Sequence, residues 1–374
     1  MDTTVRPRAR RSELARRIAL LDIPAGRAVS PDGEAARVHT IDWLGRFGVF
    51  ADGAAAAEYD ALRLDRLSAL FWPQATGAEL DLANDINGWV FVFDDQFDGA
   101  LGCRPDAVSR LVDDIVRITH EPPGPVPTAV GADPLLASFR DLWHRLNSGM
   151  PQVWRDRTRA NWVDYLRAYT REARGKAESA PRSLAALLAV RRHSIGVHTC
   201  LDLHERFDGY ALPPAVHDSA PLAAMRAAAD DVVIFVNDIV SLDKELATGD
   251  VHNSVILWRE RGGCTLEGAV RHIAGLANSR YRYFEELAAR LPGVLAEAGA
   301  SSELLRHTAL YTDGMRHVMR GNVTWSLETS RYDERGVAAV SEGRQRPWAG
   351  LTPLGGLAAP AEGVGVGAAA SGPA

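Results

Sequence analysis

The stretch Phe93-Asp94-Asp95-Gln96-Phe97-Asp98 closes the apolar run Trp89-Val90-Phe91-Val92-Phe93. On an α-helix, Asp94 and Asp98 would lie one turn apart on the same face, and Asp95 would be offset by about 100°. Like charges at this spacing repel, and carboxylates beside an apolar face are costly unless a cation lies between them. A hard divalent cation with oxygen ligands would remove that cost. A solvated acidic helix face is the alternative that this stretch leaves open by itself.

A second polar line lies in the expected helix Ala220–Ala247. Asn237, Ser241 and Glu245 follow one another at i, i+4 and i+8, so they share one helix face. Amide, hydroxyl and carboxylate oxygens suit Mg²⁺ better than zinc or copper. The line begins directly after the apolar run 232–236. Two helices that carry oxygen ligands beside apolar runs predict two walls of one cavity, with metal at its mouth.

Nearly every ordered-looking segment is predicted to be helical, because Ala and Leu abound and β-branched alternation is scarce. The absence of strand–helix alternation disfavours Rossmann and barrel folds. The fold class is therefore all-α. The expected helices are Gly53–Leu70, Ala78–Asp98, Pro105–His120, Pro134–Leu146, Gln152–Ala177, Arg182–Phe207, Ala220–Ala247, Leu266–Leu291 and roughly Ser301–Ser330.

Three regions are predicted along the chain. Residues 1–20 are rich in arginine and form a basic, flexible N-terminal arm. Residues 21–340 form a single α-helical domain, and 46% hydrophobic residues suffice for a large core. Residues 341–374 are rich in Gly, Ala and Pro and lack periodicity, so we expect a disordered tail.

The composition excludes several classes of protein. A formal net charge of −6 argues against nucleic-acid binding. Cys103, Cys200 and Cys264 form no CxxC pair, which favours a reducing compartment over a zinc site or a disulfide framework. No apolar run approaches the ~18 residues of a membrane span, and the patch after the N-terminal arginines is too short for a signal peptide. We therefore expect a cytoplasmic protein without a membrane span.

The two oxygen clusters resemble the metal-binding motifs of class I terpene synthases, particularly bacterial terpene cyclases. Asp94-Asp95-Gln96-Phe97-Asp98 is similar to their DDxxD motif. Asn237 to Glu245 matches their N-D-x-x-S-x-x-x-E motif at every fixed position, with Lys244 directly before the Glu. Arg191 lies 46 residues before Asn237, where these cyclases carry a diphosphate-sensing arginine. Trp325 and the pair Arg331-Tyr332 resemble the C-terminal aromatic residue and the Arg-Tyr diphosphate contact of the family.

The resemblance spans roughly residues 20 to 340 and implies a class I terpenoid synthase α-helical bundle that encloses an apolar active-site cavity. It also implies three Mg²⁺ ions as cofactor. Asp94 is the main expected ligand on one wall, and Asp98 is a weaker candidate. On the other wall the expected ligands are Asn237, Ser241 and Glu245. Asp95 is expected to form an ion pair rather than to bind metal, with Arg331 as the candidate partner when the site closes.

The resemblance further implies residues that act on the substrate. The expected diphosphate contacts are Arg191, Lys244, Arg331 and Tyr332, and Arg192 competes with Arg191 for the sensor role. Ser194 links the sensor to a helix break, and the main-chain carbonyl of Ile195 points at the forming cation. Gly196 permits the distortion.

Aromatic faces stabilise a carbocation, so Phe91, Trp325 and Phe71 are candidates for the cavity lining. Plain core packing is the alternative for each ring. Val90 stands where close relatives with a double aromatic before the motif would carry a second ring.

The predicted function is Mg²⁺-dependent ionisation and cyclisation of farnesyl diphosphate to a sesquiterpene, with release of diphosphate. One alternative is a diterpene cyclase that uses geranylgeranyl diphosphate. A chain-elongating prenyltransferase would show a second DDxxD motif, which this chain lacks. A catalytically silent helical binding protein would not need both oxygen clusters and the arginines. The motifs leave the product and the oligomeric state open, a homodimer included.

Overall fold

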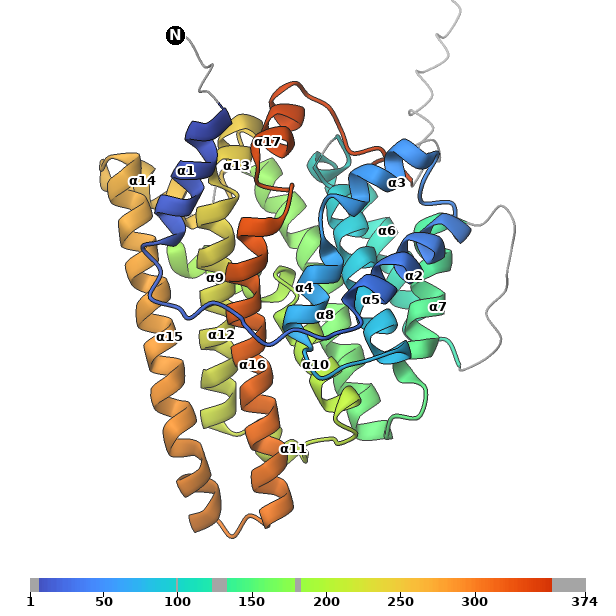
Figure 1. Ribbon diagram of the computed structural model, residues 1–374, viewed down its shortest axis with the longest axis vertical. Helices are drawn as coiled ribbons and strands as arrows, with labels where there is room; N and C mark the ends of the chain where they lie inside the picture. Colours follow the sequence, from blue (N-terminus) through green and yellow to red (C-terminus); the bar gives the residue numbers. More distant parts are fainter. Residues whose placement is uncertain (1–6, 99, 123–132, 179–182, 352–374) are drawn as a thin grey trace, which may run out of the picture.

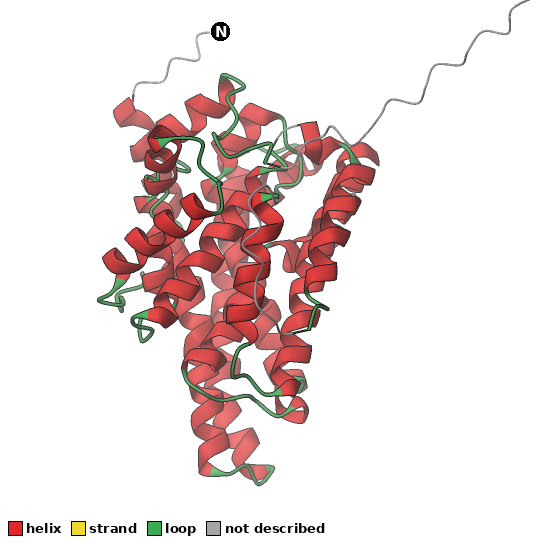
Figure 2. Cartoon of the chain, turned by 90° about the vertical axis from the view of Figure 1, so that its right-hand side faces the viewer, coloured by secondary structure: helices red, strands yellow, loops and turns green. Residues whose placement is uncertain are grey.

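The computed structural model describes residues 7–98, 100–122, 133–178 and 183–351, and every regular element among them is a helix (Figures 1 and 2). The all-α prediction is therefore confirmed. The elements in chain order are α1 (Pro7–Ile18), α2 (Gly33–Arg46), α3 (Gly53–Asp60), α4 (Leu64–Phe71), α5 (Ala78–Asp95), the 3-10 helix η1 (Ala100–Cys103), α6 (Pro105–Ile118), α7 (Pro134–Asn147), α8 (Gln152–Glu178), α9 (Leu184–Ser194), α10 (Val197–Phe207), α11 (Pro214–His217), α12 (Ala220–Val240), α13 (Leu242–Thr248), α14 (Ser254–Gly262), α15 (Leu266–Glu297), α16 (Ser302–Glu328) and α17 (Glu334–Ser341).

Helix α12 lies inside the bundle, and α15 and α16 run beside it and project beyond the other helices at one end (Figures 1 and 2). Helices α9 and α10 also contact α12. Residues 232–236 of α12 are all buried, which a helix surrounded on every side requires. This burial explains the uninterrupted apolar run directly before Asn237.

Three segments that the sequence predicts as single helices are each two helices in the structure. Within Gly53–Leu70 the break lies at Arg63, whose φ of 54° is left-handed. The carbonyl of Leu62 is thereby free to accept hydrogen bonds from Trp325 Nε1 (3.0 Å) and Thr329 Oγ1 (2.8 Å). Distant partners stabilise this break, and local helix propensity gives no sign of it. The other two breaks, at Gly196 and Ser241, lie in the candidate site.

The N-terminal arm, predicted to be flexible over residues 1–20, contains helix α1 from Pro7 onward. Residues 1–6 lie outside the described residues. Arg17, a buried side chain, donates to Asp243 Oδ1 of α13 (2.9 Å), and Ile18 is buried in the core. These tertiary contacts place the end of the arm against the bundle.

Residues 341–351 are predicted to belong to a disordered tail, but the structure describes them and several of them pack on the domain. Trp348 is fully buried, and its ring packs edge-on against Tyr59 (centroids 5.8 Å apart). Gln96 Nε2 donates to the Trp348 carbonyl (2.9 Å). The Gly-rich composition of this region gives no sign that Trp348 is buried. Residues 352–374 lie outside the described residues.

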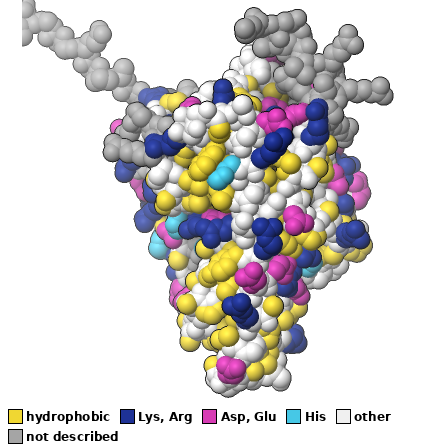
Figure 3. Space-filling view, turned by 90° about the vertical axis from the view of Figure 1, so that its left-hand side faces the viewer, with side chains coloured by type: hydrophobic (Ala, Val, Ile, Leu, Met, Phe, Trp, Pro, Cys, Tyr) yellow, Lys and Arg dark blue, Asp and Glu magenta, His cyan; other side chains and the backbone are white. Residues whose placement is uncertain are grey.

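The face formed by α1, α14 and α15 carries basic and acidic side chains interspersed with apolar ones (Figure 3). Trp258 of α14 is partly exposed there and stacks on His272 of α15, with ring centroids 3.6 Å apart. Among the described residues, no helix has the length and apolar character needed to cross a membrane.

Candidate active site

The three aspartates lie where α5 ends. The helix stops at Asp95, and Asp98 belongs to the turn that follows. The prediction that Asp98 continues the helical face of Asp94 is therefore wrong. Carboxylates at a helix C-terminus meet the negative end of the helix dipole, which is unfavourable unless cations lie beside them. The side chain of Asp95 is fully buried, whereas those of Asp94 and Asp98 are 43% and 41% exposed.

Arg331 pairs with two of these aspartates. Its Nη1 donates to Asp95 Oδ1 and its Nη2 to Asp94 Oδ2, both at 2.8 Å. The Asp95–Arg331 ion pair, which is predicted to form on closure of the site, is already present in this structure. The guanidinium also lies over the Phe91 ring, 5.1 Å from its centroid. Although the Asp94 side chain is partly exposed, its loss of hydration at the cavity wall raises its pKa, and the nearby Arg331 opposes this rise. Burial would lower the pKa of Arg331, but Asp95 and Asp94 hold this pKa well above its ordinary value.

The second cluster lies where α12 meets α13, not within one continuous helix as predicted. The break is at Ser241, yet Ser241 N still donates to the Asn237 carbonyl (2.8 Å) and Glu245 N to the Ser241 carbonyl (3.0 Å). The three side chains therefore keep their common direction. Ser241 Oγ lies 2.7 Å from Glu245 Oε1. Burial, with the nearby Asp238 carboxylate, raises the pKa of Glu245 to about 7.

The two neighbouring arginines of α9 point to different places. Arg191 Nη2 donates to Asn237 Oδ1 and to Asp238 Oδ1, both at 2.9 Å. Arg192 instead pairs with Asp231, which Arg280 of α15 also contacts. Arg191 lines the cavity that also holds Asn237, so the geometry distinguishes it from its competitor.

Helices α9 and α10 are separated by Gly196, whose φ of 76° is the left-handed conformation that glycine adopts readily. Ser194 and Ile195 precede the break and line the cavity. Ser194 Oγ donates to a carboxylate oxygen of Glu172 in α8. The break thus has a fixed contact to a neighbouring helix.

Two contacts join the walls of the site. Lys244 Nζ donates to Asp98 Oδ2 (2.7 Å), and Asn237 Nδ2 donates to Tyr332 Oη (3.0 Å). Although burial opposes it, the Lys244 ammonium holds the pKa of Asp98 below its ordinary value. Burial raises the pKa of Tyr332 to about 12, so the phenol stays protonated near neutral pH.

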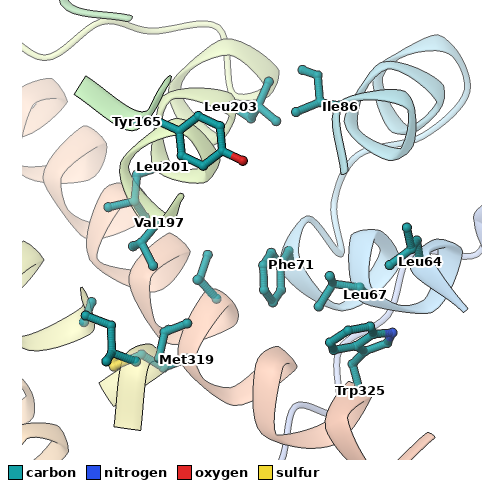
Figure 4. Packing of buried hydrophobic residues seen from close by; sticks show 14 of the residues in the cluster. Leu64, Leu67, Phe71, Ile86, Tyr165, Val197, Leu201, Leu203, Met319 and Trp325 are labelled. Atoms are coloured by element: carbon teal, nitrogen blue, oxygen red, sulfur yellow. The ribbon is translucent and has the colours of Figure 1, made fainter. Parts of the chain in front are cut away.

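All the predicted site residues line one cavity of about 220 Å³. Phe91 and Trp325 meet edge to face with ring centroids 5.4 Å apart. The ring centroids of Trp325 and Tyr332 are 5.9 Å apart. Figure 4 shows Phe71 and Leu67 beside Trp325, with Val197 across from them. The rings therefore form an apolar wall directly beneath the charged residues.

Helix α8 contributes residues that belong to neither sequence motif. Tyr165, Tyr169, Glu172 and Lys176 all line the cavity. Tyr169 Oη donates to Asp94 Oδ1 (3.1 Å), and Lys176 Nζ pairs with Asp250 (2.9 Å). Their spacing of four, three and four residues is a helical face, and this periodicity was the signal available in the sequence.

The donor chemistry of the site fits a magnesium ion. Within the described ranges, no three His, Cys, Asp or Glu side chains converge as a metal site. A metal here would therefore need the amide oxygen of Asn237 and the hydroxyl of Ser241 beside the carboxylate of Glu245, with Asp94 on the opposite wall. Magnesium accepts such hard oxygen sets with few protein carboxylates.

A family model described as "Terpene synthase family 2, C-terminal metal binding" matches residues 85–283, more than half of the chain. Isoafricanol synthase from Streptomyces violaceusniger (strain Tu 4113) is 61% identical over 354 residues, covering 93% of this chain and 92% of the relative. Pristinol synthase from Streptomyces pristinaespiralis is 51% identical over 349 residues, covering 93% and 94%. The crystal structure of germacradien-4-ol synthase from Streptomyces citricolor matches with a TM-score of 0.73 and 27% identity, covering 83% of this chain and 98% of that one.

Proposed function

The chain belongs to the terpene synthase family, and on this premise we propose that it is a Mg²⁺-dependent cyclase that converts farnesyl diphosphate to a sesquiterpene and releases diphosphate. The observation that carries the proposal is the convergence of two oxygen clusters and three cationic side chains at the mouth of one apolar cavity. The similarity to isoafricanol and pristinol synthases supports a substrate of fifteen carbons.

Bound Mg²⁺ would neutralise the departing diphosphate as a Lewis acid. We propose Asp94 as the main ligand on one wall, Asp98 as a weaker one, and Asn237, Ser241 and Glu245 as the ligands on the other. Three ions are expected from the family motifs.

Each proposed diphosphate-binding cation pairs with a side-chain oxygen of a proposed metal ligand. Arg331 pairs with Asp94, Lys244 with Asp98, and Arg191 with Asn237. Without substrate, these contacts balance the charge of the carboxylates. With metal held by these oxygens, the same cations would be available to donate to diphosphate. Tyr332, whose hydroxyl accepts from Asn237 Nδ2, would be a further donor beside them. The charge of the site is therefore balanced in both situations.

Ionisation needs an electronegative group near the carbon that loses the diphosphate. At the break before Gly196, we assign this role to the Ile195 carbonyl, and Ser194 holds the break through its bond to Glu172. Phe91 and Trp325 present ring faces to the cation and exclude water from the upper cavity. The released diphosphate accepts the terminating proton, so no separate base is required.

Incubation of the purified protein with farnesyl diphosphate and Mg²⁺, followed by gas chromatography and mass spectrometry, tests the proposal. We expect a cyclic C15 product, and none after chelation of the metal. Geranylgeranyl diphosphate is the matched substrate: preferred turnover of it would identify a diterpene cyclase. A protein that releases diphosphate from neither substrate would contradict the proposal.

A further inference from the structure

Two asparagines lie in the cavity wall below the charged residues: Asn87 of α5 and Asn322 of α16. Asn87 precedes Phe91 by one helical turn, and Asn322 precedes Trp325 by one turn. Because the Phe91 and Trp325 rings touch, both amides lie about one turn deeper than that aromatic pair. Asn87 is 4% exposed and Asn322 is 7% exposed.

The Asn322 amide lacks a partner among the described residues. Its Nδ2 is buried without a hydrogen bond within that part of the chain. Val318 and Trp325, one turn to either side on α16, line the same cavity, so Asn322 is on the cavity face of the helix. A buried amide that makes no hydrogen bond is unfavourable, whereas leucine has nearly the same shape without that cost. A polar group that enters the cavity would satisfy this side chain.

The orientation of the Asn87 amide follows from a chain of hydrogen bonds. The Ala36 carbonyl can only accept, so Asn84 must direct its Nδ2 toward it (3.1 Å). Asn84 Oδ1 then accepts from Ser68 Oγ (3.0 Å), and Ser68 Oγ accepts from Asn87 Nδ2 (2.9 Å). Asn87 Oδ1 is therefore the acceptor left over beside the cavity. The four residues of this chain of hydrogen bonds, from Ala36 to Asn87, are each at most 4% exposed, so the Asn87 amide oxygen is held in a fixed position.

We propose that Asn87 and Asn322 hold one water molecule in the cavity, and that this water attacks the final carbocation to give a sesquiterpene alcohol. A water in a protein interior needs two or more polar partners. Asn87 Oδ1 accepts one of its O–H groups, and the free Asn322 amide supplies the second contact. A lone pair of the water oxygen then remains for the cation. The inference rests on the proposed function and specifies its last step.

The step balances with the substances already present. The water oxygen forms a C–O bond to the cationic carbon, and the protonated alcohol transfers one proton to the diphosphate released at ionisation. Farnesyl diphosphate and water thus become alcohol and hydrogen diphosphate. Nothing is oxidised or reduced.

The test uses the whole protein with farnesyl diphosphate and Mg²⁺ in H₂¹⁸O. We expect the wild type to release a cyclic alcohol that carries one ¹⁸O. In Asn322→Leu the ratio of alcohol to hydrocarbon should fall by about two- to tenfold, as expected from losing one hydrogen bond to the water. Thermal unfolding of this variant should be no easier, because the amide has no partner to lose. Asn87→Leu is the second variant and should shift the ratio in the same direction.

Ser326→Ala is the matched control, since Ser326 is buried on α16 and its Oγ donates to the main-chain carbonyl of Asn322 (2.7 Å) rather than to the amide side chain. Its product ratio should equal that of the wild type. A cyclic product without oxygen, an alcohol without ¹⁸O, or an unchanged ratio in both asparagine variants overturns the water site while leaving the cyclase intact. If no prenyl diphosphate is consumed, the proposed function fails together with the water site.

Discussion

Replacing Trp348 by alanine should lower the free energy of unfolding by about 5 kcal/mol. Truncating a fully buried tryptophan costs about 3–5 kcal/mol, and losing a hydrogen bond to a carboxylate adds about 1.5 kcal/mol. Trp348 meets both conditions, because its ring is 0% exposed and its Nε1 donates to Asp95 Oδ2 (2.9 Å). The residue lies in the region whose composition predicts a disordered tail, so the effect would come from tertiary contacts alone.

The same change should lower turnover. Asp95 accepts from Trp348 through one oxygen and from Arg331 through the other, so the tryptophan helps to hold the carboxylate that positions Arg331. Trp348→Phe separates the two contributions. It keeps a ring in the site but removes the N–H donor, so we expect a loss of about 1.5–3 kcal/mol.

Urea unfolding followed by far-ultraviolet circular dichroism measures these differences. Trp258→Ala is the matched control: Trp258 is 37% exposed, and its removal should cost less than about 1 kcal/mol. If Trp348→Ala costs no more than Trp258→Ala, the segment after α17 does not anchor α5 and the reasoning is refuted.

Three further outcomes follow from the site and its supports. Asp94→Asn should lower kcat/KM for farnesyl diphosphate by about 100-fold or more while circular dichroism stays unchanged, and near-normal activity would exclude the metal role. Gly196→Ala should lower the free energy of unfolding by about 1–2 kcal/mol, because its φ is +76°. Gly275→Ala, on a regular helix with open space around it, should instead raise the free energy of unfolding by up to about 1 kcal/mol. Equal effects of the two changes in urea unfolding would refute the strained break. Burial lowers the pKa of His204 to about 3. Below about pH 6.5 the unfolded chain binds a proton at this histidine and the folded protein does not, so the free energy of unfolding falls as the pH falls, by about 2 kcal/mol at pH 5. His204→Leu should flatten the dependence of unfolding free energy on pH between 7 and 5 by that amount, and the exposed His120→Gln should not.

Much of the site could be predicted because the residues of each oxygen cluster fall within one or two helical turns of each other. The spacing of Asn237, Ser241 and Glu245 places them on one face even though the helix breaks at Ser241, because the i to i+4 hydrogen bonds continue through the break. The contribution of α8 was missed for a different reason. Tyr169 and Lys176 belong to no short motif. Their helical spacing is visible in the sequence, but only their contacts with Asp94 and Asp250 show that this helical face lines the site.

The sequence by itself determined the helical class, the two oxygen clusters and the cations expected near them, because these depend on residue types and on local periodicity. The tertiary structure decided where helices break, which partner each cation takes, and which tail residue is buried. Arg331 meets Asp95 across 236 positions and Trp348 meets it across 253. Such contacts arise only when the whole bundle packs, so no local pattern records them. The two asparagines beneath the aromatic pair belong to the same class, since only the packed cavity shows that one amide is held in a fixed orientation and the other has no partner.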